Sequence, residues 1–132
     1  MNRAELKGHI EAIEKSYEFF LAYAAQGSRD DEASKVGAQL REFLGQIGGA
    51  LGAIETELDT LVEAESLEPA EPYRDMIALT ARDAGKAGAA VRLVAAQPSI
   101  SSQLIDNLNA SLHVRTLLTD LFLLDEVLPE SG

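Results

Sequence analysis

The feature that most constrains the fold is a long run of regularly spaced apolar side chains in the second quarter of the chain. Successive members are 4, 3, 4, 4, 3, 4 and 3 residues apart: Val36, Leu40, Phe43, Ile47, Leu51, Ile54, Leu58 and Leu61. A half-buried strand would alternate every two residues, whereas this spacing places all eight side chains on one face of an α-helix. The pattern predicts a helix over residues 30–66, roughly 50 Å long.

Similar patterns predict three further helices, separated by glycine, serine and proline. Their ranges are 3–26, 72–96 and 101–128. Gly27 is placed where the first helix needs a left-handed residue to end, and Ser28 to Asp31 resembles the cap of the second. Pro72 and Pro98 interrupt the helical pattern before and after the third. The expected fold is a single all-α domain over 1–132, an up-down-up-down four-helix bundle.

The composition excludes several classes of function. The 132 residues include 22 Asp and Glu against 11 Lys and Arg, a net charge of −11 that would repel nucleic acid. There is no cysteine, and no run of apolar residues is long enough for a signal peptide or a membrane span. We expect a cytoplasmic protein that binds neither nucleic acid nor membrane, and that uses no cofactor.

Two aromatic residues of the first helix fall outside its expected core face. Phe19 and Tyr23 are one turn apart and lie roughly 120° from the face of Ile10, Ile13 and Tyr17. They are either aromatics at the margin of the bundle or one edge of an interface with another subunit or protein.

Glycines are unusually dense in the second helix. Gly45, Gly48 and Gly52 share one face, and with Gly49 they cost roughly 3–4 kcal/mol of helix stability relative to alanine. Close approach of the third helix or of another chain would offset that cost. The remaining alternative is that the glycines have no structural role.

The core face of the third helix has small side chains at its middle. Ala84 and Gly88 belong to this narrow waist, which predicts either close packing with a neighbouring helix or a cavity for a small apolar ligand. Arg115 would project from the expected core face of the fourth helix. It would pair with a carboxylate, reach the edge of the bundle, or anchor such a ligand.

The fourth helix has apolar residues on two sides. Leu104, Leu108, Leu112 and Phe122 form one face; Val114, Leu117, Leu121, Leu124 and Leu128 form the other. One copy of a four-helix bundle buries only one side of each helix, so the second face predicts an oligomer, most simply a homodimer. Leu117, Leu121 and Leu124 are the expected contacts.

Acidic residues accumulate toward the end of the second helix. Glu55, Asp59 and Glu63 lie along one side of it, although like charges at this spacing repel. They form a solvated surface, a docking surface for a basic protein segment, or a divalent-metal site. The Glu-x-x-His pairs of a di-iron bundle are absent, because alanine and leucine stand three residues before His113 and His9. We therefore predict no defined metal site.

No nucleotide-binding loop or nucleophile motif accompanies these features. The sequence is interpreted as a non-enzymatic helical protein, adaptor or chaperone-like, that acts through protein–protein interaction and forms a homodimer. Two alternatives remain: a carrier of a small apolar ligand, and a carboxylate-dependent metal enzyme that uses Glu55, Asp59 and Glu63 or Glu11 and Glu14.

Overall fold

The computed structural model describes residues 1–31 and 35–129, and these residues form an all-helical structure. No strand occurs within them. The helices are α1 (Arg3–Ala25), α2 (Lys35–Glu57), α3 (Thr60–Ala64), α4 (Ala70–Ala95), α5 (Ser102–Leu112) and α6 (Val114–Val127). None of the helices in the described ranges is both long and apolar enough to cross a membrane.

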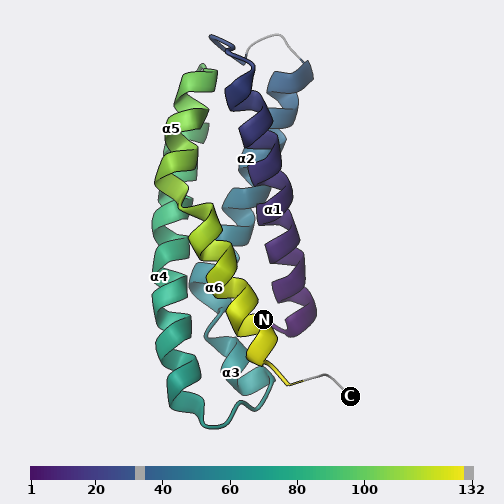
Figure 1. Ribbon diagram of the computed structural model, residues 1–132, viewed down its shortest axis with the longest axis vertical. Helices are drawn as coiled ribbons and strands as arrows, with labels where there is room; N and C mark the ends of the chain where they lie inside the picture. Colours follow the sequence, from purple (N-terminus) through teal and green to yellow (C-terminus); the bar gives the residue numbers. More distant parts are fainter. Residues whose placement is uncertain (32–34, 130–132) are drawn as a thin grey trace.

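The long helices lie side by side, with the chain reversing direction at each end (Figure 1). In the orientation of Figure 1 the chain ascends through α1, descends through α2 and α3, ascends through α4 and descends through α5 and α6. Helix α2 packs between α1 and α4, and α5 packs against both α1 and α4. The core forms along the line where these helices meet, because each contributes one apolar face to it.

The helix predicted over 30–66 is divided in the structure. Helix α2 ends at Glu57, a turn follows at Leu58 and Asp59, and the short α3 continues to Ala64. Leu58 and Leu61 are nevertheless fully buried, so the apolar face passes through the turn without losing its contact with the core. The predicted start at residue 30 is wrong, because Asp30 and Asp31 are not helical. The next three residues, 32–34, lie outside the described residues.

The helix predicted over 101–128 is also divided, and here the break changes the interpretation. His113 has φ 49° and ψ 43°, a left-handed backbone that an α-helix cannot contain. Leu108 and Leu117 would lie about 180° apart on a straight helix, yet both are buried in the same core. The second apolar face that predicted an oligomer is therefore a core face of α6, turned inward by His113.

The interface residues predicted on this helix are consequently misplaced. Leu117, Leu121 and Leu124 are buried within one copy of the chain, so they are not available to a second copy. Phe122 and Arg115, expected on the core face, are exposed instead. The physical reason is the same rotation at His113, which exchanges the inner and outer sides of α6 relative to a straight helix.

The narrow waist of α4 is closely packed. Ala84 is fully buried, and a Cβ atom added at Gly88 would lie 3.6 Å from the Cβ of Leu51 on α2. That distance is ordinary van der Waals contact, so α2 already occupies the space beside the waist. This packing supports the first of the two expectations, close packing with a neighbouring helix, rather than a ligand cavity at Ala84 and Gly88.

The glycine face of α2 is largely open. A Cβ atom added at Gly45, Gly49 or Gly52 would meet nothing within 4 Å, while one at Gly48 would lie 3.6 Å from a methyl group of Val91 on α4. That distance is ordinary van der Waals contact, so a methyl group would fit at all four positions and close approach of α4 does not explain these glycines. Among the residues that the structure describes, no close contact at these positions offsets their helix-propensity cost.

We expect Gly49→Ala to stabilise the protein by about 0.8 kcal/mol, because alanine favours the helix and its methyl group would enter open space. Urea unfolding followed by circular dichroism measures the change. Gly27→Ala is the control and should instead cost about 1 kcal/mol, since Gly27 has φ 68°, a left-handed backbone in which a Cβ atom clashes. A loss of stability in Gly49→Ala would show that another chain covers this face.

We expect His113→Gly to stabilise the protein by about 1 kcal/mol, because glycine adopts the left-handed backbone without the clash that a Cβ atom causes. Ser111→Gly, two residues earlier in α5, is the control and should instead cost about 0.5 kcal/mol. Chemical denaturation compares the two. Destabilisation of both variants would mean that residue 113 is helical and that α5 and α6 form one straight helix.

Candidate functional site

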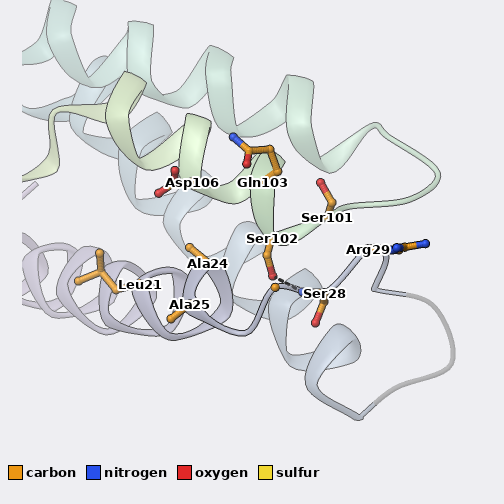
Figure 2. A pocket seen from close by; sticks show the side chains of 10 residues that line it. Leu21, Ala24, Ala25, Ser28, Arg29, Ser101, Ser102, Gln103 and Asp106 are labelled. Carbon is orange, nitrogen blue, oxygen red and sulfur yellow. Dashed lines mark hydrogen bonds between the residues drawn. The ribbon is translucent and has the colours of Figure 1, made fainter.

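A large open hollow lies at the end of the molecule where α1 ends and α5 begins (Figure 2). It has a volume of about 630 Å³, and Leu21, Ala24, Ser28, Ser101 and Asp106 are among the residues that line it. The Ser101 side chain accepts a hydrogen bond from Leu104 N (3.0 Å), which caps α5. Arg29 points outward, away from Ser102 (Figure 2). The hollow is therefore a gap between connecting segments rather than a convergent set of free polar groups.

Ser102 joins the two loops beneath this hollow. Its hydroxyl donates to the carbonyl of Tyr23 at 2.6 Å and accepts from the amide of Ser28 at 2.9 Å. The backbone amide of Ser102 donates in turn to the carbonyl of Ser28 at 2.8 Å. The polar groups of Ser102 are thus used to connect the loop after α1 with the start of α5.

A buried carboxylate fixes the same loops from the other side. Asp31 is 7% exposed; it accepts a hydrogen bond from Arg41 Nε at 2.8 Å and one from Ile100 N at 2.7 Å. Arg41 also donates to the carbonyls of Ala95 and Gln97, both at 2.9 Å. One arginine and one aspartate therefore connect α2, the end of α4 and both loops through charge-assisted hydrogen bonds.

Tyr23 belongs to this polar network and not to an interface. It is 1% exposed, and its hydroxyl lies 2.6 Å from the carbonyl of Ile100, to which it donates. Burial, followed by the nearby charges of Asp31 and Asp30, raises the pKa of Tyr23 above 10.0, so the hydroxyl keeps its proton at neutral pH. The prediction that Tyr23 lies outside the core is wrong.

The prediction for Tyr23 failed because the core face of α1 differs from the face that the sequence pattern indicated. Ser16 is fully buried while Tyr17 is only half-buried, so the core face is rotated away from Tyr17 and toward Phe20 and Tyr23. Ser16 is tolerated there because its hydroxyl donates to the carbonyl of Ala12 at 2.7 Å. Phe19 is half-buried, and its ring stacks on the ring of Phe43 of α2 with 4.7 Å between the ring centroids. Phe19 therefore also packs within one chain.

The pKa of Asp31 lies below its ordinary value of 3.8: burial alone would raise it, but the hydrogen bonds and charge of Arg41 and the Ile100 amide outweigh burial. The carboxyl group of Asp31 therefore takes up its proton at a higher pH in the unfolded state than in the folded state. The stability that Asp31 contributes to the folded state is complete above the ordinary pKa of 3.8 and declines as the pH falls below it.

We expect Asp31→Asn to cost about 2 kcal/mol at pH 7 and to flatten the decline of stability below about pH 4. Urea titrations between pH 7 and pH 2.5 measure both effects. Asp106→Asn, on the exposed side of α5, is the control and should change neither the stability at pH 7 nor its decline in acid. An unchanged acid profile in Asp31→Asn would contradict the assigned network.

The predicted acidic residues do lie together. Glu55, Asp59 and Glu63 are exposed and line one hollow of about 450 Å³ beside α4, which contributes Arg74 to it. The Glu55 side chain lies against α4 at Gly85, where an added Cβ atom would overlap its carboxylate. Within residues 1–31 and 35–129, no group of three or more His, Asp or Glu side chains is arranged to hold a metal ion. The metal alternative therefore has no geometric support in this hollow.

Arg115 is not an anchor for a ligand at the α4 waist. It lines a small hollow of about 220 Å³ at the junction of α5 and α6, together with Tyr17, Asn109 and His113. The amide nitrogen and oxygen of Asn109 are buried there without a hydrogen-bond partner among the described residues. Arg115 itself is exposed, so its guanidinium is solvated rather than buried.

An open, mainly apolar surface lies between α4 and α6, where the sequence pattern did not indicate one. Here α6 slants away from α4 toward the start of α1 (Figure 1), and Arg3 holds it there through an ion pair with Asp125 (3.8 Å) and a hydrogen bond to the Pro129 carbonyl. A hollow of about 380 Å³ is left, which we call the α4–α6 groove. It is lined by Pro69, Pro72, Tyr73, Met76, Leu123, Leu124 and Val127.

The walls of the α4–α6 groove are unusually exposed for apolar residues. Leu123 is 53% exposed and Val127 is 46% exposed, and both line the groove. Large aliphatic side chains gathered in this way are typical of a protein contact surface, whereas single exposed leucines are ordinary. The groove could have been found from the sequence only if the rotation of α6 at His113 had been recognised.

Two carboxylates follow the groove along the same seam. Asp120 lies one turn before Leu123 and Leu124 on α6, and Asp83 lies seven residues after Met76 on α4. Burial, and then the charge of Asp83, raises the pKa of Asp120 above 3.8. Neither carboxylate forms an ion pair with any residue in the described parts of the chain.

Comparison of the chain with family models, curated proteins and solved structures found no match.

Proposed function

We propose that this chain is a non-enzymatic protein-binding module, adaptor or chaperone-like, and that its contact surface is the α4–α6 groove. The observation that carries the proposal is the exposure of Leu123 and Val127 beside Tyr73 and Met76. Their burial against a partner would gain roughly 25 cal/mol for each Å² of apolar surface removed from water. A protein that acts by contact needs such a surface, and the convergent acid, base or nucleophile of an enzyme is not required.

The proposed architecture behind this surface is an up-down-up-down four-helix bundle. We count α2 with α3, and α5 with α6, as one rod each, because the apolar face continues across each break. In this arrangement α4 is a shared wall: its inner face belongs to the core, and its outer flanks border both the α4–α6 groove and the acidic hollow at Glu55, Asp59 and Glu63. Docking of a basic protein segment in that acidic hollow stays a prediction.

Homodimer formation also stays a prediction, and its basis has changed. The leucines that suggested it are buried in one copy, so the α4–α6 groove is the apolar surface that we propose a second copy would cover. A homodimer and a complex with another protein would use the same side chains, and one experiment can separate them.

A photo-crosslinking residue at position 123 tests the proposal, and position 93 is the matched control. Leu123 and Leu93 are both exposed leucines, at 53% and 67%, but Leu93 lies outside the α4–α6 groove near the other end of α4. After irradiation in the native cell, we expect a protein adduct from position 123 and little from position 93. An adduct of twice the chain mass would identify a homodimer. No adduct from position 123, or equal adducts from both, would contradict the proposal.

A further inference from the structure

We propose that the α4–α6 groove binds an amphipathic helix of another protein, whose apolar face fills the groove between Met76 and Leu123 and whose Lys or Arg pairs with Asp83 and Asp120. This inference rests on the proposed protein-binding function and adds the chemistry of the partner. It follows from the shape of the groove, from the charges along it and from the total charge of the chain.

The groove has the form that a helix fits. Its walls are the helices α4 and α6, which diverge toward the end of α6, and its apolar floor includes Leu124. From Pro72 to Asp83 the seam spans eleven residues of α4, about 17 Å, which matches about three turns of a docked helix. Side chains at positions i, i+3, i+4 and i+7 of such a helix would reach the groove together.

The charge at one end of the groove specifies the partner further. Asp83 and Asp120 are close enough for the charge of one to affect the other, and their carboxylates have no counter-ion among the described residues. Lys86 and His113 line the adjoining hollow with Asp83, but Lys86 pairs with neither carboxylate there. A cation from a partner would relieve this repulsion.

The distance between the two features sets the register. Asp83 lies seven residues, or about 10 Å, beyond Met76 along α4. The basic residue of the partner should therefore stand about two helical turns from the apolar residue that lies deepest in the groove. A sequence with that spacing has one apolar face that continues into a Lys or Arg.

A second copy of the chain is a poorer match than a basic helix. Each copy carries a net charge of −11, so two copies repel one another at long range. A basic helix is attracted by the same field before contact and is oriented by it. The charge that opposes self-association therefore assists a cationic partner.

Two synthetic peptides of about eighteen residues test the inference. Both peptides have leucine at positions i, i+3, i+4 and i+7. The first peptide has lysine two helical turns beyond its second leucine and at both of its ends. The second peptide has glutamate at each of those lysine positions. Fluorescence anisotropy at 0.15 M salt measures each affinity for the full chain. We expect the lysine peptide to bind at least tenfold more tightly than the glutamate peptide.

Matched variants locate the binding. Asp83→Asn with Asp120→Asn should weaken the lysine peptide about tenfold, whereas Glu11→Gln with Glu18→Gln, which removes the same charge from the exposed side of α1, should change it less than twofold. Leu123→Ser with Val127→Ser should also weaken it about tenfold, and Leu21→Ser with Leu93→Ser, two exposed leucines outside the groove, should not. Thermal melting of each variant verifies that it is folded.

Each contrary result overturns the inference in a recognisable way. Equal binding of both peptides, with loss only in the Leu123 and Val127 variant, would reject the basic partner but keep the groove as a protein-binding surface. Equal losses of peptide affinity in the Asp83 and Asp120 variant and in the Glu11 and Glu18 variant would show that only general charge attraction holds the peptide. Failure of both peptides to bind, together with a dimer mass that Leu123→Ser reduces to a monomer in light scattering, would assign the groove to a second copy.

Discussion

The left-handed backbone at His113 determines where the last part of the chain can bury its side chains. Without it, the leucines of α6 would face away from the core that α5 joins, because nine residues of straight helix turn the apolar face by about 180°. With it, Leu108 and Leu117 enter the same core. The same change of direction carries α6 away from α4 to meet Arg3, which leaves the α4–α6 groove open (Figure 1).

The opposite end of the molecule is held by polar contacts instead. Asp31 and Arg41 use their hydrogen-bonding groups on the two loops and on the end of α4, and Tyr23 adds a hydroxyl from α1. Because buried charges are costly unless they are paired, this network fixes the loop positions more specifically than apolar packing could. One end is thus ordered by a network, and the other carries the exposed apolar surface.

The sequence predicted the parts of the structure that depend on a constant helical period. Long helices, their approximate ends and the buried face of α2 follow from apolar spacing, since neighbouring residues of a helix turn by a fixed angle. The break at His113 violates that assumption, and its only sign was an apolar face that changed sides within one predicted helix. Asp31 resembled a helix cap because acidic residues favour that position, but its true partners are distant in sequence. Such pairings depend on how the loops meet, which periodicity does not describe.

The open glycine face of α2 has a consequence for how the chain folds. Gly45, Gly49 and Gly52 weaken the helix, and a Cβ atom added at any of them would meet no atom of the described residues within 4 Å. A peptide of residues 35–57 alone would therefore have little helical structure in water, because short helices depend on propensity when no neighbour supports them. The helical structure of α2 therefore depends on the docking of its leucines on α1 and α4, so substitutions in that contact should unfold α2 together with its neighbours.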